Sequence, residues 1–114
     1  MDSIDGGRSR ARLVAERARL VEEIGEVIAL PDQMTYGSQA AAATQVFEQE
    51  RELALRERAG LHLEAVDDAL ARLDDGTYGT CVRCGRPIAP DRLDALPWAA
   101  HCIECQTIVD RGHR

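Results

Sequence analysis

The segment CVRCGRPIAPDRLDALPWAAHCIEC, residues 81–105, decides the fold expected for this chain. It holds all four cysteines as two pairs, Cys81 with Cys84 and Cys102 with Cys105, and seventeen residues separate the pairs. A gap of two residues lets a tight turn aim both thiolates of a pair at one ion, and two pairs complete a tetrahedron. The spacing therefore predicts one structural Zn²⁺ with four cysteine ligands and no open position for a catalytic water.

The region around the cysteines is too small to fold by burial alone. The 34 residues from Cys81 to the end include three prolines and one tryptophan, Trp98, which we expect in a small core of this module. Metal binding should therefore supply the folding free energy. A rubredoxin-type iron centre is the alternative occupant, whereas a redox-active cysteine pair would need a βαβ context.

The three histidines are not needed as ligands. His101 precedes Cys102, but four cysteines already fill the coordination sphere, so we expect a partly exposed residue or one that supports a ligand. We expect His62 and His113 on the solvated surface. Tyr78 should pack where the module joins the rest of the chain.

The sequence before the cysteines predicts two long helices. Apolar residues recur at spacings of three and four from Ser9 to about Leu30, where Pro31 ends the pattern. Strong helix formers then run from Ser38 to the stop signal Asp74-Asp75-Gly76. Because about seven residues join them, the helices should run antiparallel.

A tight turn would leave part of the second helix uncovered. If Leu30 faces Ser38, residue i faces residue 68 − i, and Leu13 lies opposite Leu55. Four apolar residues then have no partner on the first helix: Leu63, Val66, Leu70 and Leu73. We expect the carboxy-terminal module to cover them through Ile103, Ile108 and Val109, with a homodimer contact as the competing explanation.

The predicted fold is mostly α-helical. Residues 1–7 form a flexible amino terminus, and residues 8–75 form a long antiparallel coiled-coil hairpin with its tip near 31–37. Residues 76–114 form a small four-cysteine zinc-finger module with a short carboxy-terminal helix.

Charge argues against broad nucleic-acid binding. The chain has 14 arginines, no lysine and 20 acidic residues, a net charge of −6, and a four-thiolate zinc site would bring it to about −8. Residues 1–80 carry −7 and residues 81–114 carry +1, while residues 20–52, nearest the tip, hold seven acidic residues against Arg51. This run is either a solvated face or a tip that is steered into a positive cleft on a protein partner.

The chain shows no sign of export or catalysis. It has neither a secretory signal pattern nor a long apolar stretch, so we expect a cytoplasmic protein without membrane contact. In a reducing compartment, cysteines hold metal more often than they form disulfides. No nucleophile–base pair or open metal site is evident, so we do not expect an enzyme.

Four motifs resemble the DksA/TraR zinc-finger family: DGTYGTC at 75–81, CGRPI at 84–88, RLDALPWA at 92–99 and CIECQ at 102–106. The resemblance extends more loosely through the hairpin. It implies a bacterial transcription regulator that binds RNA polymerase rather than DNA, with its hairpin in the secondary channel and acidic tip residues near the active centre. Some members respond to the alarmone ppGpp, which we assign to no residue here.

The tip departs from the family pattern. The best-known members read D-x-x-D-x-A, where this chain has Asp32 to Gly37. Asp32 matches the first acidic residue, while Thr35 and Gly37 replace the second acidic residue and the alanine. The resemblance therefore carries over only Asp32 as a partner-binding residue.

Two other functions compete with this one. A zinc-capped coiled-coil adaptor would dimerise, or would dock on another protein, through the stripe from Leu63 to Leu73. A DNA-binding finger would use Arg83, Arg86 and Arg92, but a module of charge +1 makes this the weaker hypothesis. We expect a monomer or a weak dimer.

Overall fold

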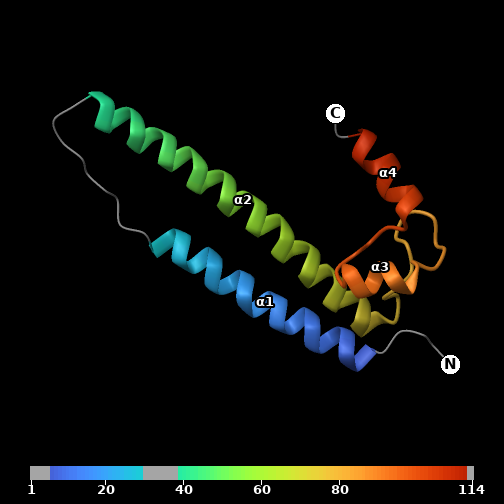
Figure 1. Ribbon diagram of the computed structural model, residues 1–114. Helices are drawn as coiled ribbons and strands as arrows, with labels where there is room; N and C mark the ends of the chain where they lie inside the picture. Colours follow the sequence, from blue (N-terminus) through green and yellow to red (C-terminus); the bar gives the residue numbers. More distant parts are fainter. Residues whose placement is uncertain (1–5, 30–38, 113–114) are drawn as a thin grey trace.

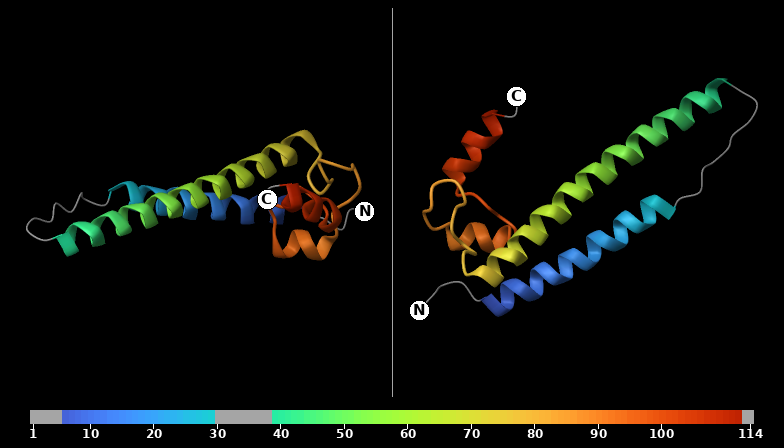
Figure 2. Two further views of the ribbon diagram at one scale, coloured as in Figure 1. Left: turned by 90° about the horizontal axis from the view of Figure 1, so that it is seen from above. Right: turned by 180° about the vertical axis from the view of Figure 1, so that it is seen from behind.

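The computed structural model describes residues 6–29 and 39–112, which form four helices (Figure 1). Helices α1 (Gly6–Ala29) and α2 (Gln39–Asp75) lie side by side as an antiparallel hairpin. Helices α3 (Pro90–Ala95) and α4 (Ile103–Gly112) belong to a small module at the base of the hairpin, the end that holds Gly6 and Asp75 (Figure 2). The mostly helical fold is confirmed.

The ends of the hairpin helices differ slightly from the prediction. Helix α1 begins at Gly6, so the last two residues of the predicted flexible segment are helical. The predicted tip, residues 31–37 with Asp32, Thr35 and Gly37, lies outside the described residues.

No helix in the described part of the chain is both long and apolar enough to cross a membrane.

Helix α2 stops where the sequence predicts. Gly76 has φ +82°, a conformation that suits glycine, and the N–H of Thr77 donates to the carbonyl of Arg72 at 2.9 Å. The Asp75 carboxylate accepts hydrogen bonds from both the hydroxyl and the N–H of Thr77, which lower its pKa. These contacts turn the chain sharply out of α2 into the module.

A buried seam joins α1 and α2. Its fully packed members are Leu13, Leu20, Ala59, Val66 and Ala69. Two ion pairs flank this seam: Arg10 with Asp74 at 2.8 Å and Arg17 with Asp67 at 2.7 Å. These exposed pairs contribute little to stability, but they mark which residues face each other.

The register expected from a tight turn is wrong. In both ion pairs the residue numbers total 84 instead of 68, so α1 lies beside the half of α2 nearest the base. Leu63, Leu70 and Leu73 therefore pack against the seam. On α2 the exposed large apolar side chains include Leu61, which is 68% exposed, and three residues further from the base: Val46, Phe47 and Leu53, which are 53%, 75% and 53% exposed. This register covers the residues that a tight turn would have left without a partner, because Val66 is buried in the seam and Leu63, Leu70 and Leu73 pack against it.

The carboxy-terminal module does pack on this region, as expected, but not through the residues expected. Ile103 and Ile108 are 62% and 47% exposed, and α4 stands apart from α2 (Figure 1; Figure 2, right). The seam is extended by Tyr78 and Trp98, which pack against it from the module. The adaptor hypothesis therefore loses the exposed stripe on which it rested.

Replacing Val66 with alanine should destabilise the protein by about 2 kcal/mol, because it removes two buried methyl groups and leaves a cavity in the seam. Val66 is fully buried, whereas Val14 on α1 is 52% exposed. The matched change Val14→Ala should therefore alter stability by less than about 0.5 kcal/mol. Urea unfolding of the zinc-loaded proteins, followed by circular dichroism, measures both, and equal losses would contradict the assigned seam.

Candidate metal centre

The first cysteine pair lies on a tight turn between two short extended segments. Thr80 and Pro87 form an isolated antiparallel bridge, and the N–H of Cys81 donates to the carbonyl of Arg86 at 2.8 Å. The N–H of Gly85 returns to the carbonyl of Cys81 at 2.9 Å, and its φ of +76° explains why glycine follows the second cysteine. This turn aims the thiols of Cys81 and Cys84 to the same side.

The second pair lies at the start of a helix. Cys102 directly precedes α4, and Cys105 lies in its first turn. The N–H of Cys105 points at the sulfur of Cys102, 3.5 Å away, so Cys102 caps the helix as a serine would. The partial positive charge of this helix end favours thiolates.

The four sulfurs converge as the spacing predicts. All lie within 4.8 Å of one another, and the sulfurs of Cys84 and Cys102 are 3.8 Å apart. A tetrahedron with Zn–S bonds of about 2.3 Å has S–S edges of about 3.8 Å. All four are free cysteines, so the donor set fits one structural Zn²⁺, for which we propose Cys81, Cys84, Cys102 and Cys105 as ligands.

The pKa values of the two buried thiols move in opposite directions. Burial raises the pKa of Cys81, but the backbone N–H groups of Cys84, Cys102 and Arg83 outweigh it and lower the pKa to about 5. Burial raises the pKa of Cys105 to about 12, against the opposing effect of the Arg83 guanidinium. A bound divalent metal favours all four thiolates, because its charge lies directly against the sulfurs.

A small apolar cluster supports the cysteines. Ile88, Leu93 and Ala99 are buried together with Cys81 and Cys105. Tyr78 packs against both this cluster and the hairpin seam, and its hydroxyl donates to the carbonyl of Pro97 at 2.8 Å. The predicted place of Tyr78 at the joint is confirmed.

Trp98 does not occupy the place expected for it. It packs against the hairpin seam rather than inside the cluster below the cysteines. Its ring meets that of His62 edge-on, with centroids 4.3 Å apart, and the His62 side chain is only 26% exposed. The expectation of a solvated His62 is therefore wrong. His101 is half-buried and lies outside the sulfur cluster, as expected, while His113 lies outside the described residues.

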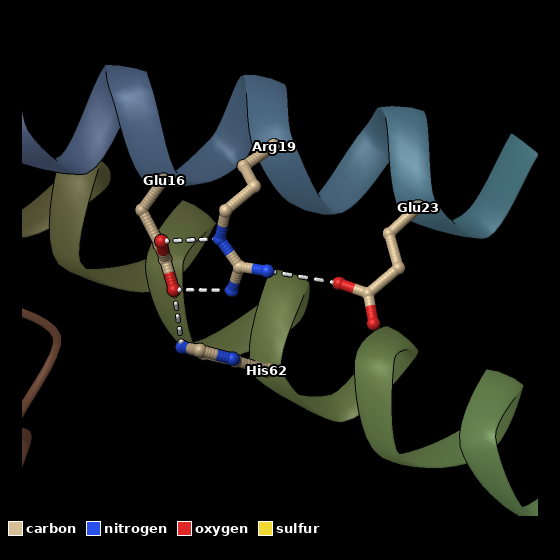
Figure 3. Close-up of polar contacts among 4 residues, drawn as sticks. All are labelled: Glu16, Arg19, Glu23 and His62. Carbon is tan, nitrogen blue, oxygen red and sulfur yellow. Dashed lines mark hydrogen bonds and ion pairs between the residues drawn. The ribbon is translucent and has the colours of Figure 1, made fainter.

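Glu16 on α1 contacts His62 beside this joint (Figure 3). Its carboxylate accepts hydrogen bonds from Nε and Nη2 of Arg19, both at 2.9 Å, and the Nε2 atom of His62 lies 3.3 Å away. The hydrogen bonds from Arg19 hold the pKa of Glu16 below its usual value, although burial acts in the other direction. Arg19 also donates to Glu23 at 3.0 Å.

A second polar contact ties the module to α1. The Arg12 guanidinium donates to the backbone carbonyl of Asp94 at 2.6 Å and lies 3.5 Å from its carboxylate, which Arg8 also approaches at 3.5 Å. From α2, Arg72 donates to the carbonyl of Ala99 at 3.3 Å. The module is therefore held against both helices of the hairpin. The only signal for these contacts in the sequence is the arginine-rich start of α1.

Comparison with known proteins confirms the resemblance seen in the motifs. Residues 76–111 match the family model of the prokaryotic dksA/traR C4-type zinc finger. Over 103 residues the chain is 34% identical to the RNA polymerase-binding transcription factor DksA of Haemophilus influenzae, covering 89% of this chain and 71% of that protein. An uncharacterized protein of Aquifex aeolicus is 45% identical over 49 residues, which cover 43% of this chain and 34% of that protein.

The fold has a close structural counterpart as well. The structure of transcription factor DksA2 from Pseudomonas aeruginosa aligns with a TM-score of 0.77 at 31% sequence identity, covering 99% of this chain and 88% of that one. The Haemophilus and Pseudomonas proteins are named transcription factors, which agrees with the expectation that this chain is not an enzyme.

Removing the two buried cysteines together, by Cys81→Ser and Cys105→Ser, should abolish zinc binding, because two thiolates cannot complete the site. The wild-type protein should hold one zinc per chain, measured by elemental mass spectrometry after dialysis. Val82→Ser with Ile103→Ser is the matched control, since each residue directly follows a cysteine and is 57% or 62% exposed. A full zinc complement in the cysteine variant, or zinc loss in the control, would refute the ligand assignment.

Proposed function

This chain belongs to the DksA/TraR family of zinc-finger proteins, and on that basis we propose that it regulates bacterial transcription by binding RNA polymerase in the cytoplasm. The observation that carries the proposal is the match to the DksA protein of Haemophilus influenzae, which extends through hairpin and zinc finger alike. The name of that relative states that it binds RNA polymerase.

The hairpin is the part that we propose enters the secondary channel of the polymerase. The molecule is elongated, 66 Å by 31 Å by 20 Å, and α2 continues well past the segment paired with α1 (Figure 1). Residues 20–52 carry a net charge of −6. An acidic end on a narrow rod suits a narrow positively charged opening, because opposite charge speeds and orients association.

The metal has a structural role in this proposal. Four cysteines leave no position for a substrate or a catalytic water, so zinc supplies the folding free energy of the module. The module then packs Trp98 and Tyr78 on the seam at the base of the hairpin. This packing fixes the orientation of the hairpin relative to the zinc-finger module.

Asp32 is the tip residue that we propose acts on the polymerase. It is the one acidic position that the resemblance carries over, since Thr35 stands at the second. Asp32 extends the acidic character of the neighbouring stretch, in which Glu22, Glu23 and Glu26 precede it.

The contacts of the module's arginines weaken the DNA-binding alternative. The guanidinium of Arg83 points to the sulfur of Cys105, and Nε of Arg92 donates to the carbonyl of His101 at 3.0 Å. Arg86 lies 3.9 Å from the carboxylate of Glu104. Phosphate contacts would have to compete with each of these interactions.

Asp32→Ala should reduce the effect of the protein on transcription in vitro by more than about tenfold while it still binds core RNA polymerase, because the base of the hairpin is unchanged. Asp68→Ala is the matched control, since Asp68 is exposed on α2 near the base and should leave both readouts unchanged. Transcript yield and a pull-down at low salt measure the two effects. Failure of the wild-type protein to associate with core polymerase at low salt would end the proposal.

A further inference from the structure

Hydrogen bonds to the sulfurs help to stabilise the thiolates of a four-cysteine zinc site, in addition to the metal itself. Four thiolates and one Zn²⁺ carry a net charge of −2, and burying that charge is costly unless hydrogen bonds or a cation offset it. In this module one cysteine of each pair, Cys81 and Cys105, is buried, so water does not reach these two residues as it reaches the exposed Cys84. The protein itself must supply the donors.

Three of the four sulfurs have backbone donors. The backbone N–H groups of Arg83, Cys84 and Cys102 donate hydrogen bonds to the sulfur of Cys81. The sulfur of Cys84 accepts from the N–H of Arg86 at 3.5 Å, and that of Cys102 accepts from the N–H of Cys105 at 3.5 Å. The turn and the start of α4 leave these N–H groups free to point at sulfur.

Cys105 is the exception. Because it lies inside α4, the N–H groups that follow it are directed along the helix, and that of Gln106 already donates to the carbonyl of Cys102 at 2.9 Å. Within the described residues, the one donor at its sulfur other than the neighbouring thiols is the guanidinium of Arg83, with Nη1 3.7 Å away. Cys105 is only 4% exposed.

We propose that Arg83 is a positioning residue of the metal centre, which holds the Cys105 thiolate on Zn²⁺ by donating to its sulfur and offsetting its charge. Arg83 lies between the cysteines of the first pair, whereas Cys105 belongs to the second pair. The contact therefore also ties the two halves of the site together. A side-chain donor here replaces the backbone donor that the helical position of Cys105 excludes.

The module offers a matched control. Arg86 is also an arginine of the first turn, but its side chain is 75% exposed and lies 3.9 Å from Glu104 rather than on a sulfur. Arg86→Ala removes the same charge and keeps the backbone N–H that serves Cys84. It therefore separates the loss of net charge from the loss of the sulfur contact.

The first test is the rate at which zinc-loaded full-length protein gives up its metal to an excess of the colorimetric chelator 4-(2-pyridylazo)resorcinol, followed by the absorbance of the zinc complex that forms. Arg83→Ala should release zinc about tenfold faster than wild type, the lower end of the effect of removing a group that supports a ligand. Arg86→Ala should stay within about twofold, and Arg83→Lys should recover much of the loss because it restores a charged donor.

The second test uses cobalt as a probe of the sulfurs. In Co²⁺-loaded protein, losing a hydrogen bond to a thiolate raises the energy of its electrons, so the sulfur-to-cobalt charge-transfer band of Arg83→Ala should move to longer wavelength. Arg86→Ala should leave the band in place. If Arg83→Ala loads poorly, Arg83→Gln, which keeps a donor without the charge, should show an intermediate release rate. Equal zinc release from the Ala variants of Arg83 and Arg86, or an unshifted band, would overturn the proposal.

Discussion

The convergence of four sulfurs within 4.8 Å is the constraint on which the rest of the structure depends. The two cysteine pairs lie at the ends of a 25-residue segment, so bringing them together closes that segment into a loop. The closure brings Ile88, Leu93 and Ala99 into one cluster with the buried cysteines. It also presents Tyr78 and Trp98 to the hairpin. Without a metal, so few buried side chains would not hold this loop closed.

The hairpin and the module stabilise each other at the base. Trp98 meets His62 from α2, while Arg12 from α1 reaches the carbonyl of Asp94. Most of the buried apolar surface of the hairpin lies in the same region, because α1 pairs with the half of α2 nearest the base. The contacts at the base therefore hold the fold together. The other end of α2 exposes large apolar side chains such as Phe47.

The sequence predicted those features that depend on local chemistry. The cysteine spacing predicted the metal centre, and Gly76 marked the end of α2. The register of the hairpin was missed, because the expected register assumed a tight turn between the helices, whereas the spacing of apolar residues identifies the buried face of each helix and not its position along the other helix. In the observed register, Trp98 and Tyr78 of the module pack against the seam between the helices. The contacts of His62 with Glu16 and of Arg83 with Cys105 join residues 46 and 22 positions apart, which no local pattern encodes.

The central claim is that the zinc-stabilised base presents the hairpin tip to the interior of RNA polymerase. The most direct measurement places a photoreactive amino acid at Gln33, beside Asp32, and maps the crosslinks formed with the bacterial core enzyme. The account predicts crosslinks to the catalytic subunits, at residues that line the secondary channel. The same probe at Glu64, exposed near the base, should not reach those residues. Tip crosslinks confined to the outer surface of the polymerase, or none at all, would contradict the account.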